Sequence, residues 1–126
     1  MLGTRGGILI LWDDNVVDCA NFVLGEWFIS ADVTIKECST NFRLTAVYGP
    51  TKHRALQQFS EELRTLRPNP NTRWLILGDF NLIYKASDKN NNKINHRLMQ
   101  QFRDALDDCD LLEIHLQNHK FTWSNE

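Results

Sequence analysis

The sequence feature that most constrains the fold is WLILGDFN at residues 74–81, where four consecutive apolar residues end at Gly78. A run without polar alternation predicts a strand that is buried on both faces, at the centre of a sheet. Asp79 and Asn81 follow the glycine directly. Because α/β sheets place ligand-binding groups beyond the carboxyl ends of their strands, this polar pair has two interpretations, a ligand site or a turn.

Three further strands are predicted before this run. Residues 7–12 (GILILW) predict a short buried strand that is closed by a turn. Residues 26–37 and 41–48 contain alternating apolar and polar side chains, which predicts two adjacent antiparallel strands joined by the turn at residues 39–41. Gly49 and Pro50 end the second of these strands.

Two amphipathic helices are also predicted. The first is capped by Thr51 and stopped by Pro68 and Pro70, and its apolar stripe consists of Ala55, Leu56, Phe59, Leu63 and Leu66. The second runs from residue 95 to about residue 108, after a polar surface loop at residues 85–97. Its stripe consists of Leu98, Met99, Phe102, Ala105, Leu106 and Cys109. With an extended segment at residues 111–116 and a strand at residues 120–125, the order predicts a mixed α/β (α+β) layered sandwich.

Composition limits the classes of protein that this chain can belong to. Its 126 residues suffice for one domain, and the 42% hydrophobic and 24% charged residues are typical of a globular protein. No apolar run approaches the ~20 residues of a membrane span, so we expect no membrane partner. The net charge of −2 gives no general attraction to nucleic acid, although a local basic patch or bound divalent cations would supply one. Three widely spaced cysteines, Cys19, Cys38 and Cys109, indicate reduced, small apolar side chains and an intracellular setting.

Three residues are candidates for chemistry. If the chain stays extended past Gly78, Asp79 and Asn81 point to the same side. There the carboxylate can move a proton or hold a cation, and the amide can donate to a phosphate oxygen. Tyr48 ends a strand just before a turn, so its phenol can donate a hydrogen bond at the sheet end. The alternative for Tyr48 is a half-buried residue at the sheet edge.

Other polar clusters carry weaker signals. Cys109, His115 and His119 have a metal-like spacing but lack a clear fourth zinc ligand. Two groups of aspartates are expected to be solvated, one in a turn near the N-terminus and one on the acidic face and end of a helix: Asp13, Asp14 and Asp18, and Asp104, Asp107, Asp108 and Asp110.

The motifs GGILILW, AVYGP, WLILGDFNLI and FTWSN occur in this order, separated by a helix and then by a polar loop with a helix. This set resembles the endonuclease/exonuclease/phosphatase superfamily, the metal-dependent phosphodiesterases that include DNase I and the apurinic endonucleases. It is most similar to the endonuclease domain of plant LINE-type (non-LTR) retrotransposons. The similarity covers residues 6–125 and implies a partial DNase I-like domain over residues 1–126, truncated at both ends.

The resemblance also implies roles for the candidate residues. Asp79 would transfer a proton at the scissile phosphodiester, Asn81 would orient the phosphate and stabilise its developing charge, and Tyr48 would hydrogen-bond to the phosphate. Trp123 corresponds to an aromatic position that flanks the site, where we expect it to pack. The family implies Mg²⁺ as cofactor, DNA as partner and the nucleus as one intracellular location.

Two family motifs have no counterpart in this sequence. These are the Gln-Glu-Thr-like motif with the metal-binding Glu and the Ser-Asp-His motif with the catalytic His, so the metal ligand stays unassigned. Because such groups act as a unit, we expect the chain alone to be an inactive fragment of an endonuclease domain. The alternative is a non-catalytic remnant that binds nucleic acid or protein, or that has no function.

Overall fold

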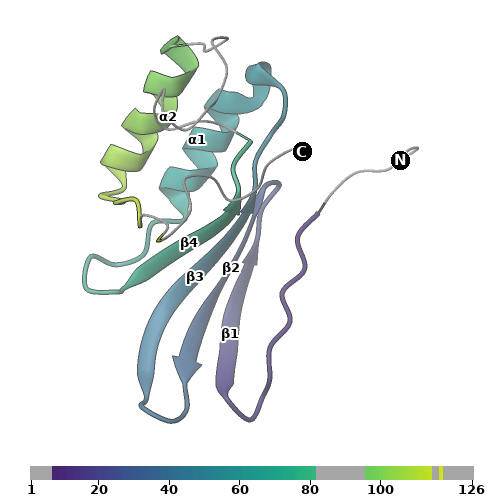
Figure 1. Ribbon diagram of the computed structural model, residues 1–126, viewed down its shortest axis with the longest axis vertical. Coiled ribbons are helices and arrows are strands. Elements are labelled where there is room, and N and C mark those ends of the chain that lie inside the picture. The colour runs from purple at the N-terminus through teal and green to yellow at the C-terminus, as the bar shows by residue number, and fades with distance from the viewer. Residues whose placement is uncertain (1–6, 82–95, 115–116, 118–126) are drawn as a thin grey trace.

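The computed structural model describes residues 7–81, 96–114 and 117. They form an α+β fold with a four-stranded mixed sheet and two α-helices (Figure 1). The strands lie in the order β1 (Val17–Leu24), β2 (Phe28–Ile35), β3 (Thr40–Tyr48) and β4 (Trp74–Asp79). The first three are antiparallel to one another, whereas β4 is parallel to β3. The predicted mixture of strands and helices is therefore confirmed.

The β2–β3 hairpin confirms the predicted antiparallel pair. Eight register pairs join the strands without a break, from Phe28 opposite Val47 to Ile35 opposite Thr40. The turn occupies residues 36–39 rather than residues 39–41, and Ser39 closes it with a left-handed φ of 54°. This conformation suits a small polar residue whose side chain can bond locally.

The predicted strand at residues 7–12 is wrong. This segment has no regular secondary structure, and Leu9 and Leu11 are 80% and 81% exposed. A fully apolar strand needs a layer on each face, and the described residues supply neither layer here. The first strand is instead β1, which the sequence analysis missed. Its β-branched and aromatic residues favour a strand, but the pairing shifts near Asn21, whose φ is 55°.

The prediction that the strand at residues 74–77 is buried on both faces is also wrong. Within the described sheet β4 is an edge strand, paired with β3 alone. Trp74 and Ile76 pack against the main core, whereas Leu77 is 49% exposed. The unalternated apolar run therefore has one face against the helices and one face that no described element covers.

Both predicted helices are present. A short 3-10 turn (η1, His53–Ala55) leads into α1 (Leu56–Thr65), and α2 spans His96–Asp108. The predicted cap at Thr51 is wrong, because α1 begins after Ala55 and has no side-chain cap. None of the helices in the described ranges is long and apolar enough to cross a membrane.

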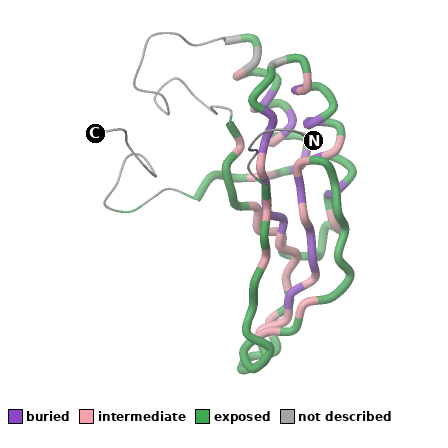
Figure 2. Tube along the Cα trace, turned by 90° about the vertical axis from the view of Figure 1, so that its right-hand side faces the viewer, coloured by how far each residue is buried: buried purple, intermediate pink, exposed green. Residues whose placement is uncertain are grey.

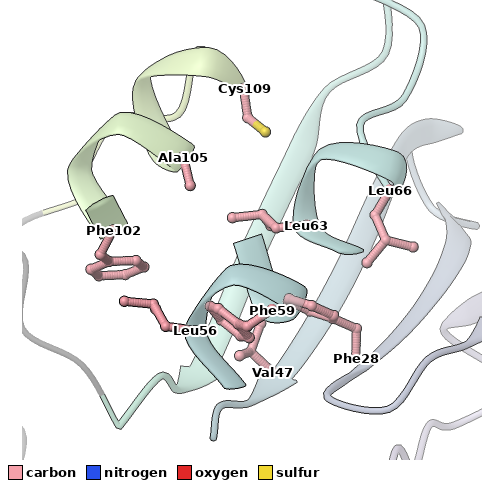
Figure 3. Packing of buried hydrophobic residues seen from close by; sticks show 9 residues of the cluster. All are labelled: Phe28, Val47, Leu56, Phe59, Leu63, Leu66, Phe102, Ala105 and Cys109. Atoms are coloured by element: carbon pink, nitrogen blue, oxygen red, sulfur yellow. The ribbon is translucent and has the colours of Figure 1, made fainter. Parts of the chain in front are cut away.

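The main core lies between the two helices and one face of the sheet (Figure 3). Phe59 of α1 stacks on Phe28 of β2, with ring centroids 5.0 Å apart. The buried cluster consists of Phe28, Val47, Leu56, Phe59, Leu63, Leu66, Phe102, Ala105 and Cys109. This confirms four of the five residues of the first predicted stripe, half of the second, and the predicted small apolar role of Cys109. Cys38, in contrast, is exposed.

Aspartates at the end of α2 and just after it pair with arginines at the end of α1 and just after it. Arg64 lies 2.7 Å from Asp108, and Arg67 bonds to Asp110 and to the Asp108 carbonyl. Such exposed pairs contribute little stability, but the arginines offset the negative charge of the aspartates at the end of α2. Asp13, at the other end of the molecule, accepts the hydrogen bonds of a turn before β1, as predicted.

Several predicted features lie wholly or largely outside the described residues. These are the loop at residues 85–97, the strand at residues 120–125, His115, His119 and Trp123. Residues 111–114 have no regular secondary structure. Buried positions lie mainly on the inner strands and helices, whereas β1 and the segment before it are mostly exposed (Figure 2).

Candidate functional site at the ends of β3 and β4

Tyr48 and Asp79 are brought side by side at the ends of two parallel strands. They are register partners, the last pair of the β3–β4 ladder. The Gly49 N–H donates to the Asp79 carbonyl oxygen at 2.7 Å and extends the pairing by one step. The two motifs VYGP and GDFN, which are 31 residues apart in the sequence, are therefore one structural unit.

Glycines allow these strand ends to approach so closely. Gly78 has a φ of +135°, and a Cβ atom there would lie 2.1 Å from the Val47 carbonyl oxygen. A Cβ atom on Gly49 would lie 2.0 Å from the Phe80 carbonyl oxygen. Side chains at these positions would separate the backbones, so both glycines are needed for the geometry.

Asp79 and Asn81 form a turn rather than an extended pair. The Asn81 N–H donates to Asp79 Oδ1 at 2.9 Å, and Asn81 has a left-handed φ of 54°. The Asn81 side-chain Nδ2 donates to the Gly49 carbonyl oxygen at 2.7 Å. The chain therefore does not stay extended past Gly78, and its backbone forms the turn that was one of the two predicted possibilities. The same contacts fix Asn81 against the end of β3.

Phe80 anchors this turn to the core. Its ring centroid lies 5.4 Å from that of Phe102 and 6.4 Å from that of Phe59. The aromatic side chain points into the core while its two polar neighbours, Asp79 and Asn81, are exposed. The sequence analysis assigned Phe80 no role, although an aromatic residue between two polar ones was a usable signal for an anchored turn.

Some polar groups of the site can still form hydrogen bonds with a ligand. Asp79 Oδ2 and the hydroxyl of half-buried Tyr48 make no hydrogen bond to any described residue. The Asn81 amide nitrogen can donate a second hydrogen bond, because one of its two hydrogens is committed to Gly49. A carboxylate oxygen, a phenol and an amide donor are thus presented together at one strand end.

Positive electrostatic contributions lie at the same end of the molecule. Both helices begin at the end where β3 and β4 finish (Figure 1), and neither has an acidic residue in its first turn. A helix N-terminus carries a partial positive charge and unpaired N–H groups. Lys52 and Arg54, just before α1, are exposed and have no ion-pair partner among the described residues. The sequence analysis missed this pair, although it directly follows VYGP.

The described residues do not fit a Mg²⁺ site. They contain no group of three or more His, Cys, Asp or Glu side chains that could hold a metal ion. Asp79 is the single carboxylate in VYGP and GDFN. Mg²⁺ in proteins is held by one or two carboxylates together with substrate phosphates and water, so Asp79 would supply at most one of its ligands and substrate and water the rest.

Neither a scan against models of protein families nor a search of curated proteins returned a match to this chain.

Proposed function

We propose that this chain carries the central part of a DNA phosphodiesterase site of the endonuclease/exonuclease/phosphatase type, on a partial DNase I-like fold. The closest resemblance is to the endonuclease domain of plant LINE-type retrotransposons. The observation that carries the proposal is the register pairing of Tyr48 with Asp79. It brings two motifs of the family together at one strand end, where ligand sites of α/β sheets occur.

The chemistry of the three side chains supports a phosphate ligand. The Tyr48 hydroxyl and the Asn81 amide are hydrogen-bond donors, and phosphate oxygens are acceptors. Lys52, Arg54 and the start of α1 favour an anion at this end. The Asp79 carboxylate is then the group that would accept or return a proton during cleavage.

Cleavage by this chain alone is not expected. An ionised Asp79 repels the phosphate unless a cation offsets its charge, and the described residues do not complete a cation site. The sequence also contains no counterpart of the family's Gln-Glu-Thr-like and Ser-Asp-His motifs. No reaction step is therefore assigned to a metal ion.

A second candidate is a nucleic-acid-binding remnant without catalysis. It is favoured by the hydrogen bonds that hold Asp79 Oδ1 and the Asn81 amide within the turn itself. In this case the turn positions Tyr48, Lys52 and Arg54 for the DNA backbone, and no proton is moved.

A nicking assay on supercoiled plasmid with Mg²⁺ tests the proposal. The wild-type chain is compared with Asp79→Ala and with the control Asp13→Ala. In the wild type, Asp13 Oδ1 accepts a similar turn hydrogen bond from the Asn15 N–H, far from the site. We expect no nicking above background by any of the three proteins.

Two other outcomes would change this conclusion. Nicking by the wild type and by Asp13→Ala, but not by Asp79→Ala, would assign catalysis to this site and overturn the expected inactivity. Nicking that is unchanged by Asp79→Ala would contradict any role of the site in cleavage.

A further inference from the structure

Most basic side chains of the described residues fall into two groups. The first group forms ion pairs, each with an aspartate, and consists of Lys36, Arg43, Arg64 and Arg67. The second group is exposed, forms no ion pair with any residue that the structure describes, and consists of Lys52, Arg54, Arg73 and Arg97. Acidic residues outnumber basic ones by 16 to 14 in the chain, so a shortage of carboxylates does not explain the second group.

Three of these four unpaired cations lie at one end of the molecule. Lys52 and Arg54 directly follow the VYGP motif and precede α1, and Arg97 is the second residue of α2. Both helices begin at the end where β3 and β4 finish, which is the end that carries the candidate site (Figure 1). Arg73 is different, because it precedes the first residue of β4 and so lies at the opposite end of that strand from Asp79.

The nearby carboxylates do not neutralise the three cations. Asp79 lies in the turn after β4, where its Oδ1 accepts the Asn81 N–H. Glu26 lies in the turn between β1 and β2, beside Trp27, whose carbonyl oxygen accepts the Tyr48 N–H at 2.9 Å. Neither carboxylate forms an ion pair within the described ranges. The three basic side chains can therefore bind an external anion.

The distribution of these cations over two helices fits a polyanion better than a single anion. The two helices share the main core, and the axes of packed helices lie about 8–10 Å apart. A DNA duplex carries one phosphate per ~3.4 Å of axis on each strand, so this separation corresponds to about three base steps. Phosphates a few steps apart on one strand can thus reach cations on both helices.

We infer that Lys52, Arg54 and Arg97 form one contact surface for the DNA backbone, which extends from the Tyr48–Asp79 strand end across the starts of both helices. The inference rests on the proposed function for the identity of the ligand, and it adds α2 as a second element that contacts the DNA. Contacts of this kind fix the position of a duplex and carry no direct sequence information.

The salt dependence of binding tests this surface, measured by fluorescence anisotropy of a labelled duplex without added metal. Counterion release makes the logarithm of the association constant fall with the logarithm of the salt concentration, by about 0.9 per neutralised phosphate. We expect Lys52→Gln, Arg54→Gln and Arg97→Gln each to make this slope shallower by about 0.9. Each variant should then lose about 3.5-fold less affinity than the wild type between about 50 and 200 mM salt.

Arg73→Gln is the matched control, since it removes the same charge from an exposed, unpaired arginine at the other end of β4 and should leave the slope unchanged. Circular dichroism checks that each variant stays folded. Equal slopes for Arg97→Gln and Arg73→Gln would overturn the inference, because α2 would then contact no phosphate. A wild type that does not bind the duplex would overturn it as well.

The outcome for this surface is distinguishable from the outcome for the proposed function. If the three slopes become shallower while Asp79→Asn leaves the affinity unchanged, the contact surface is supported and the position of a phosphate beside Asp79 is contradicted. If Asp79→Asn binds more tightly while the three slopes equal that of Arg73→Gln, the proposed function is supported and the contact surface is overturned.

Discussion

At the end of β4, the single residue Asn81 has two structural roles. Asn81 holds a left-handed backbone and bonds through both its N–H and its amide, so one residue closes the turn and fixes it to Gly49. Asparagine tolerates this conformation because its short side chain bonds locally. The sequence therefore indicated two interpretations, site or turn, and the structure has the turn at the place where a site is proposed.

Glu62 is a carboxylate whose ionisation opposes the fold. It lies on α1 against the turn between β1 and β2, and its Oε1 atom is buried without a hydrogen-bond partner in the described part of the chain. Burial raises the pKa of Glu62 above its ordinary value of 4.5, the Glu26 charge raises it further, and the backbone N–H groups of Trp27 and Glu26 oppose the shift.

A pH dependence of stability follows from this shift. Between pH 4.5 and the raised pKa the folded chain binds more protons than the unfolded chain. The contribution of Glu62 to the free energy of unfolding therefore falls as pH rises through this window. We expect Glu62→Gln to remove that fall, as measured by urea denaturation across the window. Glu61→Gln, at an exposed position on the same helix, is the matched control. A Glu62→Gln profile that parallels the wild type would contradict the assignment.

At the scale of elements, the sequence predicted the strands and helices whose apolar and polar residues alternate regularly. The β2–β3 alternation and both helix stripes could be predicted, since each element buries one face. The apolar runs at residues 7–12 and 74–77 were misplaced, because a run without alternation states only that both faces are apolar. Whether layers cover those faces depends on the rest of the fold. Strand β1 was missed because the irregularity near Asn21 breaks its alternation.

The contact between β3 and β4 leaves no room for a side chain at Gly78. Gly78→Ala introduces a Cβ atom against the Val47 carbonyl oxygen and forces alanine to a φ of +135°. We expect it to lower the free energy of unfolding by at least about 2 kcal/mol, measured by chemical denaturation. Gly7→Ala is the control, because nothing lies within 4 Å of an added Cβ there. Equal stability of the two variants would mean that the close approach of Gly78 to β3 does not constrain the fold.

At the scale of the whole molecule, one sheet supports both the core and the candidate site. Its helix side forms the main core, and the carboxyl ends of β3 and β4 carry the candidate site. The order of β2, β3, α1, β4 and α2 could be predicted from the sequence, whereas β1 could not. The parallel β3–β4 pairing that joins Tyr48 to Asp79 could not, since it depends on contacts between residues far apart in the chain.

The central claim, that DNA phosphates lie beside Asp79, is tested most directly by fluorescence anisotropy of a labelled duplex without added metal. The compared proteins are the wild type, Asp79→Asn and Asp13→Asn. Both substitutions remove one negative charge from an exposed turn whose Oδ1 accepts a backbone hydrogen bond. We predict that Asp79→Asn binds DNA several-fold more tightly, because it removes a charge next to the phosphates, and that Asp13→Asn binds like the wild type. Equal affinities of the two variants would contradict the claim.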